Sequence, residues 1–368
     1  MKYKFEDIIF NITEKKKPVE EDKYNYIGLE HLESGNLFIS KWGSDTAPEG
    51  EKIVMKKGDV LFGKRRAYQK KVAISPIDGI FSAHGMVLRP KEDVICKEFL
   101  PFFISSEAFL NEAIRISVGG LSPTINWKDI KELEFDLPSL AEQKVLAEKL
   151  WAAYEVKQSY LKMIAATEEM VKAQFIEMLK GKEPNGKIAD LVDTNINSVK
   201  KSFNKEDLIE YIDISSVNAK SRTLNETTQY IVSSAPSRAQ QCVQNGDILV
   251  STVRPINRNV AVVDRDLTNL VASTGFCVLR PKDGYREYLL SIVTSDRYTE
   301  KMCDIASGGL YPAVNNSDVL SYDIFIPDKD FLNRVTQIYR QADKSISELR
   351  KSIDAIDKVI KSLINENL

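Results

Sequence analysis

The chain has 368 residues, of which 43% are hydrophobic and 28% are charged, and the charges nearly cancel to a formal net charge of −2. This length predicts two domains of about 140 residues each with connecting elements, and the near neutrality excludes a global field that attracts nucleic acid or membrane. Any anion-binding site must therefore come from a local group of basic residues. The N-terminal segment has no apolar signal region and no run approaches 18 apolar residues, so we expect a cytoplasmic protein without a membrane span.

The four cysteines, Cys96, Cys242, Cys277 and Cys303, are scattered and form no Cys-x-x-Cys pair. This spacing is poor for a zinc site and poor for a disulfide framework. We expect ordinary reduced thiols and no metal site.

The same ordered set of short motifs occurs twice, about 190 residues apart. Gly58-Asp59-Val60-Leu61 returns as Gly246-Asp247-Ile248-Leu249, Leu88-Arg89-Pro90-Lys91 returns as Leu279-Arg280-Pro281-Lys282, and Gly119-Gly120-Leu121 returns as Gly308-Gly309-Leu310. Solenoid repeats have periods of about 20 to 50 residues, so this period indicates a duplicated domain instead. Two versions of one domain suggest two versions of one ligand.

Each copy begins with a mixed segment, predicted as residues 1–138 and 183–327. Short strand-like runs such as 59–62, 248–251 and 276–279 are bounded by Gly, Pro, Asn and Asp. Helical stretches are expected at 98–116 and 286–305. The fold class is therefore α+β, with two duplicated mixed domains.

A long helix is predicted after each mixed segment, at 139–182 and 328–368. No Gly or Pro interrupts the 42 residues from Ser139 to Lys180 or the 41 residues from Asp328 to Leu368. The second helix has apolar residues spaced alternately by three and four, and the first has a weaker series of the same kind. These residues are Ile346, Leu349, Ile353, Ile356, Ile360 and Leu363 in the second helix, and Leu146, Leu150, Leu161, Ile164, Val171 and Phe175 in the first.

A helix of this length with one apolar stripe needs a partner, and the duplicate of matched length is the nearest candidate. The six-residue linker 181–186 spans about 20 Å at most, whereas each helix reaches about 60 Å, so a parallel arrangement is excluded. We predict an antiparallel intramolecular coiled coil with pseudo-twofold symmetry and one mixed domain at each end.

A local basic cluster follows the first Gly-Asp motif. Residues 52–71 contain eight Lys or Arg against one Asp, a surplus suited to phosphate contact. The equivalent loop of the second copy is less charged but rich in Arg and Asn, which pair with guanine and adenine edges. A plain solvated loop is the alternative. The candidate DNA-contacting residues are Lys64, Arg65, Arg66, Tyr68, Lys70 and Lys71 in the first copy, and Thr252, Arg254, Asn257, Arg258 and Asn259 in the second.

The Gly-Gly loops form a second candidate surface. Paired glycines allow backbone amides to approach an anion, but the same loops also suit a tight connection into a helical turn capped by Asn126 or Asn315. His84 stands where the second copy has Thr274, which argues against a catalytic histidine and for a specificity residue. The candidates here are Gly119, Gly120, Ser122, Thr124, Gly308, Gly309 and Tyr311, with His84 and Thr274.

Motifs for catalysis are missing from the sequence. It has two histidines and no Gly-x-Ser-x-Gly elbow, P-loop, Gly-x-Gly-x-x-Gly or His-Glu-x-x-His motif. The Asn-Pro-Pro-Tyr motif of adenine-N6 methyltransferases is also absent. We expect a reader of sequence that carries no chemistry of its own.

The order of these elements resembles the specificity subunit of type I restriction-modification systems. The resemblance lies in the Gly58-Asp59 strand with its basic loop, the Leu88-Arg89-Pro90 strand, the Gly-Gly loop, and Leu137-Pro138-Ser139-Leu140-Ala141-Glu142-Gln143 at the start of the long helix. In that family the last stretch commonly reads Leu-Pro-Pro-Leu-x-Glu-Gln. Ser139 departs from it, and the second copy from Ile326 to Asn333 has drifted further.

The resemblance implies that each mixed domain is a target recognition domain for one half of a bipartite, asymmetric site in double-stranded DNA. It implies that the paired helices set the spacer and dock two modification subunits, with two restriction subunits in the full complex. S-adenosylmethionine, ATP and Mg²⁺ would then belong to those partners, and no cofactor to this chain. Two alternatives are an adapter that organises partners through its coiled coil without reading DNA, and an enzyme with an unrecognised acid/base pair.

Overall fold

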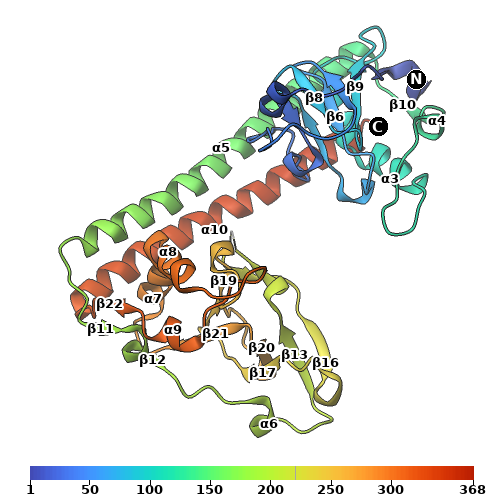
Figure 1. The fold of residues 1–368 in the computed structure, drawn as a ribbon. Coiled ribbons are helices and arrows are strands. Elements are labelled where there is room, and N and C mark those ends of the chain that lie inside the picture. Colours follow the sequence, from blue (N-terminus) through green and yellow to red (C-terminus); the bar gives the residue numbers. More distant parts are fainter. Residues whose placement is uncertain (220) are drawn as a thin grey trace. The chain divides into compact units, whose positions relative to one another are not determined.

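The computed structural model describes residues 1–219 and 221–368, which divide into two compact units of mixed α and β structure (Figure 1). Unit 1 comprises Met1–Lys162 and Leu349–Leu368, and unit 2 comprises Met163–Glu348. The predicted α+β class with two similar domains and two long helices is confirmed. Each long helix contributes residues to both units.

Unit 1 contains two four-stranded sheets. The first has the order β2 (Ile9–Ile12), β9 (Met86–Pro90), β6 (Val60–Phe62), β7 (Val72–Ile74), and all its pairs are antiparallel. The second has the order β3 (Lys15–Lys16), β5 (Lys52–Met55), β8 (Gly79–Phe81), β4 (Tyr26–Ile27), and its last pair is parallel. A short ribbon joins β1 (Lys2–Lys4) to β10 (Glu134–Asp136). The helices are α1 (Phe5–Ile8), α2 (Leu100–Ser105), α3 (Glu107–Arg115) and α4 (Trp127–Ile130), with 3-10 turns η1 (Glu20–Asn25), η2 (Leu29–His31) and η3 (Ala67–Gln69).

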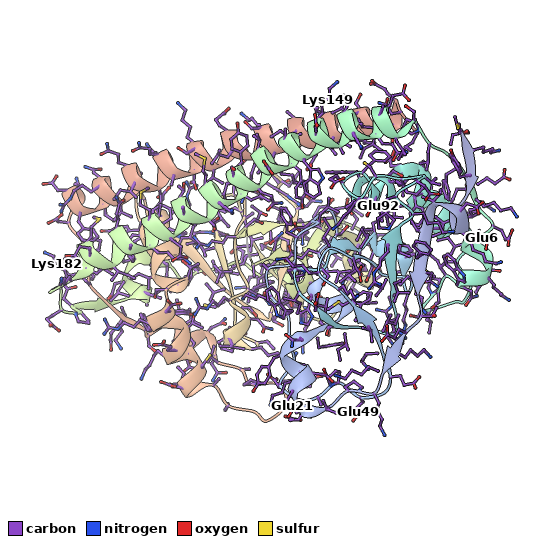
Figure 2. The ribbon with its side chains drawn as sticks, turned by 90° about the horizontal axis from the view of Figure 1, so that it is seen from above. Glu6, Glu21, Glu49, Glu92, Lys149 and Lys182 are labelled. Atoms are coloured by element: carbon purple, nitrogen blue, oxygen red, sulfur yellow. The ribbon has the colours of Figure 1, made fainter. Side chains whose placement is uncertain are left out.

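Strand β6 separates the two hydrophobic layers of unit 1. Val60 and Phe62 join the cluster formed with α2 and α3, whereas Leu61 joins the cluster that contains Phe81 of the second sheet. Alternate residues of a strand point to opposite faces, so a fully apolar strand is required where both faces are covered. The surface of this unit carries Glu6, Glu21, Glu49 and Glu92, which are labelled in Figure 2.

Unit 2 repeats this plan. Its first sheet has the order β12 (Val192–Asp193), β21 (Phe276–Pro281), β18 (Ile248–Ser251), β19 (Val260–Val262), and its second the order β16 (Thr228–Ile231), β13 (Leu208–Ile212), β20 (Leu270–Ser273), β17 (Ala239–Cys242). Strands β13 and β20 are parallel, as β4 and β8 are in unit 1. Short ribbons join β11 (Gly186–Lys187) to β22 (Asp323–Ile324) and β14 (Val217–Asn218) to β15 (Thr223–Leu224). The helices are α6 (Val199–Ser202), α7 (Arg286–Val293), α8 (Asp296–Ile305) and α9 (Asn316–Leu320), with η4 (Ile188–Leu191), η5 (Ile214–Ser216), η6 (Val232–Ser234) and η7 (Pro255–Asn257).

The helical stretches predicted at 98–116 and 286–305 are each two helices, which corrects the expectation. A serine breaks each stretch: Ser106 accepts a hydrogen bond from the amide of Phe109, and Ser295 accepts one from the amide of Tyr298. A serine at an N-cap takes extended backbone angles and satisfies an amide of the next helix. Both stretches therefore bend at equivalent places, and the duplication extends to the bend.

Helix α5 (Leu140–Leu179) is anchored to unit 1 at its start. The buried amide of Gln143 donates hydrogen bonds to the carbonyls of Val94 (2.9 Å) and Pro138 (3.0 Å), and its oxygen accepts one from the amide of Cys96 (2.8 Å). Ser139 and Glu142 form a reciprocal cap, because the Ser139 amide donates to Glu142 Oε2 at 2.8 Å. A fully satisfied buried amide fixes the direction in which α5 leaves the sheet.

Helix α10 (Lys329–Asn365) packs against α5 within each unit, and within unit 1 the two helices run antiparallel. In unit 1, Leu150 shares a cluster with Ile364, and Lys157 forms a 2.6 Å ion pair with Asp357. In unit 2, Phe175 shares a cluster with Val335. A continuous coiled coil stays a prediction. Lys149 lies on the exposed face of α5 (Figure 2).

One residue of the apolar stripe predicted on α5 is not buried. Leu161 is 40% exposed, whereas Leu146, Leu150, Ile164, Val171 and Phe175 are buried. On α10, Ile353 is buried and Ile346, Leu349, Ile356, Ile360 and Leu363 are half-buried, while the buried Ile364 was not predicted. Where no domain packs on the helix pair, the apolar stripe of one helix is covered only by the other helix. Side chains of the stripe then stay partly in solvent.

Candidate nucleic-acid interface

In each unit, a buried ion pair lies at the start of the strand that leads into the candidate loop. In unit 1, Gly58 has a φ of 90° and turns the chain into β6, and the carboxylate of Asp59 accepts hydrogen bonds from Arg89 Nε (2.6 Å) and NH2 (2.9 Å). In unit 2, Gly246 has a φ of 89°, and the carboxylate of Asp247 accepts hydrogen bonds from Arg280 Nε (2.9 Å) and NH2 (2.8 Å). The repeated Gly-Asp and Leu-Arg-Pro motifs therefore supply the two partners of one ion pair. A bidentate pair fixes adjacent strands in register.

The loop after each of these strands has an unusual backbone. Arg66 and Lys70 adopt left-handed angles (φ 55° and 50°) on either side of η3, and Arg254 and Arg258 do the same (φ 49° and 50°) around η7. Left-handed angles are uncommon for residues other than glycine and cost free energy. Their recurrence at equivalent positions shows that both units build the same loop from different residues.

The Gly-Gly loop pairs with this basic loop in each unit. The amide of Arg66 donates to the carbonyl of Pro123 (2.7 Å), and the amide of Ile125 donates to the carbonyl of Lys64 (3.0 Å). In unit 2, Arg254 donates to Pro312 (2.7 Å) and Val314 to Thr252 (2.9 Å). The two candidate surfaces thus form one structure, which we call the double loop: residues 63–71 with 117–125 in unit 1, and 251–259 with 306–314 in unit 2.

The side chains of the unit 1 double loop form a polar network. Arg65 Nε donates to Ser122 Oγ at 2.8 Å, and its NH1 lies 3.4 Å from His84 Nε2. Burial lowers the pKa of His84, and the positive charge of Arg65 lowers it further. A neutral imidazole can accept a hydrogen bond from the guanidinium. Arg66 and Tyr68 are exposed beside this network.

The unit 2 double loop carries different side chains on the same backbone. The Arg254 guanidinium lies 4.6 Å from the centre of the Tyr311 ring and donates to the carbonyl of Leu310 at 3.3 Å. Arg258 forms a 2.5 Å ion pair with Asp296 at the start of α8. Asn257 and Thr274 are exposed, and Asn259 is half-buried. Cation–π stacking holds Arg254 in one orientation at the surface.

The structure separates the basic cluster that the sequence suggested. Lys56 and Lys57 precede β6, whereas Lys64, Arg65 and Arg66 follow it, so the charges lie at opposite ends of a strand. Three further basic or polar residues of these regions make structural contacts. Lys52 is buried and donates to the carbonyls of Glu49 and Gly50, and Lys71 donates to the carbonyl of Leu29. Thr252 is buried and donates to the carbonyl of Gly275. Lys70 and Thr124 are half-buried.

The alternative of a helical turn capped through Asn126 or Asn315 is met only in position, because neither side chain makes a cap hydrogen bond. Asn126 and Asn315 occupy the N-cap positions of α4 and α9, and the amide of Asn315 donates to Asp318 Oδ2 at 2.7 Å. Gly119, Gly120, Gly308 and Gly309 are exposed at the loop tips. The leucine after each pair, which is exposed in both units, was not among the predicted site residues; its repetition beside the glycines was the available signal.

Across residues 1–219 and 221–368, no three His, Cys, Asp or Glu side chains gather so as to hold a metal ion. In the same residues, no helix combines the length and apolar character needed to cross a bilayer.

Known proteins resemble part of this chain in sequence and the whole of it in fold. Residues 2–159 match the family model of the type I restriction modification DNA specificity domain. The specificity subunit of the type I restriction enzyme HindI from Haemophilus influenzae is 34% identical over 127 residues, which cover 33% of this chain and 28% of that protein. The specificity subunit of EcoKI from Escherichia coli is 33% identical over 117 residues, which cover 30% and 23%.

The matched segments therefore span less than a third of either relative. A chain from a solved structure of the type I R-M system, concerned with complex assembly and conformational transition, matches 100% of this chain and 97% of its own length. Its TM-score is 0.53 and its sequence identity is 18%, so this likeness establishes the fold alone. Residues 2–159 are thus similar to type I restriction modification DNA specificity domains.

Proposed function

We propose that this chain is the DNA-recognition subunit of a type I restriction-modification complex and has no catalytic activity of its own. Each unit reads one half of a bipartite, asymmetric site in double-stranded DNA. One observation carries this proposal: the two double loops share a backbone but present different polar side chains. Val253, Tyr311 and Thr274 occupy in unit 2 the positions that Arg65, Ser122 and His84 occupy in unit 1. A common scaffold with divergent donors and acceptors suits two different base sequences.

In this proposal α5 and α10 set the separation between the half-sites and dock two modification subunits, with two restriction subunits in the full complex. Both helices contribute residues to both units, which supports a role as spacer. S-adenosylmethionine, ATP and Mg²⁺ act in those partners. Phosphate contacts shared with partner subunits are compatible with the net charge of −2.

Methylome sequencing of the host with and without this gene tests the proposal. We expect a methylated bipartite motif that disappears on deletion and returns on complementation. Native mass spectrometry of the complex purified through a tagged chain gives its stoichiometry. An adapter that does not read DNA predicts the same partners but an unchanged methylome, so an unchanged methylome overturns recognition.

Exchange of residues 185–327 for those of a relative tests whether the units act independently. We expect one half of the methylated motif to change and the other to stay. A change in both halves would show that neither unit reads its half-site alone.

A further inference from the structure

Each double loop carries a leucine at its tip that lies almost entirely in solvent. Leu121 is 99% exposed in unit 1, and Leu310 is 87% exposed in unit 2. Both follow the repeated Gly-Gly pair, so they occupy equivalent positions. Burial of a leucine is a main source of folding stability, and these two contribute none. Their presence at both tips calls for a role outside folding.

The tips are ordered hairpins. Val118 and Thr124 exchange two backbone hydrogen bonds of 3.0 and 2.9 Å, and Ser307 and Ala313 exchange two of the same lengths. The glycines that open the hairpins, Gly119 and Gly308, have φ values of 116° and 106°, which other residues rarely adopt. Each leucine therefore projects from a closed and anchored turn, and little conformational entropy is lost when it contacts a ligand.

A guanidinium group lies beside each leucine. Arg65 donates a hydrogen bond to the side chain of Ser122, the next residue after Leu121, and Arg254 donates one to the carbonyl of Leu310 itself. An apolar point flanked by cations complements a ligand that has anionic groups around apolar surfaces. Duplex DNA has this chemistry, because phosphates flank the stacked faces of the bases.

A protein partner fits these tips less well. A stable protein interface buries about 800 Å² per partner around a contiguous apolar centre. Each hairpin, all of whose residues the structure describes, exposes only two large apolar residues, Val118 and Leu121 in unit 1 and Leu310 and Tyr311 in unit 2. A wedge in DNA needs a single apolar side chain.

We propose that Leu121 and Leu310 are apolar wedges that enter the base stack of DNA, one in each half-site. This inference rests on the proposed function and adds a mechanism to it. Each leucine partly unstacks one base step, and the adjacent arginine holds the phosphates of the opened step. Pyrimidine–purine steps open at the lowest cost, so each unit reads deformability at that step in addition to base edges.

The test uses the complex purified from its host through a tagged full-length chain, and duplexes that carry the methylated motif found by methylome sequencing. The fluorescent adenine analogue 2-aminopurine replaces each adenine in and beside the motif in turn, because its emission rises when it is unstacked. We expect one step in each half-site to brighten on binding. Leu121→Ala should abolish the rise in one half-site only, and Leu310→Ala in the other, each with a loss of affinity of about tenfold.

Two kinds of control sharpen this test. Leu121→Met and Leu310→Met keep an apolar side chain and should keep both the fluorescence rise and the affinity. Leu267→Ala removes a leucine that is 45% exposed and lies outside the double loops, and it should change neither.

An unchanged fluorescence rise in the alanine variants overturns the wedge. Loss of co-purified modification subunits in those variants also overturns it, because the tips would then dock protein. Failure of the proposed function appears separately, as the absence of any methylated motif that depends on this gene.

Discussion

The backbone amide of Arg66 donates a 2.7 Å hydrogen bond to the carbonyl of Pro123, and the same bond joins Arg254 to Pro312 in the second unit. Because only backbone atoms form this bond, it holds the double loop together whichever side chains the loop carries. Ser122 in one unit and Tyr311 in the other can therefore differ without any change in the scaffold. Side chains are free to diverge where the scaffold does not depend on them.

Replacement of Asp59 by asparagine should lower the free energy of unfolding of unit 1 by about 3 kcal/mol, because a partly buried Arg89 loses its charged partner. All three tryptophans, Trp42, Trp127 and Trp151, belong to unit 1, so tryptophan fluorescence in a urea titration reports this unit alone.

A matched control is Glu112→Gln, which removes an exposed ion pair with Arg115 and should cost at most about 0.5 kcal/mol. Equal shifts in the urea midpoint of the two variants would contradict a structural role for the Asp59 pair.

Charge reversal of Arg65 and Arg66 to glutamate should weaken DNA binding and reduce the salt dependence of the affinity by roughly two phosphate contacts. The measurement is the slope of log affinity against log salt concentration for the assembled complex. Lys56→Glu with Lys57→Glu changes the same charge at the other end of β6 and should leave the slope unaltered. Equal effects of both pairs would mean that the double loop has no special contact with phosphate.

Insertion of four residues next to Thr167 in α5 should change the preferred spacer between the half-sites or abolish binding. The insertion lengthens a helix by about 6 Å and adds slightly more than one turn. Binding to a series of duplexes with increasing spacer length measures the preference. Thr167→Ala, which keeps the helix length, should retain the original spacer. An unaltered preference after the insertion would show that the helices do not set the distance.

Cys277 should resist alkylation in the native protein. Burial raises the pKa of its thiol to about 12, so at pH 8 about one thiol in ten thousand is the reactive thiolate. Iodoacetamide at pH 8 should label the half-buried Cys242 and Cys303 first, as followed by peptide mass spectrometry. In urea all four cysteines should react together. Native labelling of Cys277 as fast as Cys303 would disprove the packing of the unit 2 core.

The duplication could be predicted from sequence because the residues that repeat have roles few others can fill. Gly58 and Gly246 need positive φ values, and Asp59 and Asp247 need a buried partner. The long helices were predictable as well, since they lack both Gly and Pro. The break at Ser106 was not, because one serine in a helical pattern does not reveal that it caps a new helix.

Side-chain surroundings were harder to predict than the backbone. The charge of Lys52 suggested a place on the binding surface, but its ammonium group donates hydrogen bonds to carbonyls of its own turn. Leu161 fits the apolar spacing, yet its exposure depends on what covers the helix at that height. The contact between the basic loop and the Gly-Gly loop is a long-range pairing that spacing along the chain does not encode.

The division of the chain between its two units has a consequence for synthesis. Unit 2 is one continuous stretch, residues 163–348, whereas the core of unit 1 includes Ile364, which the ribosome adds after the whole of unit 2. The domain translated first is therefore completed last. A nascent chain exposes the apolar patch around Leu150 until α10 arrives, so the order of maturation is the reverse of the order of translation.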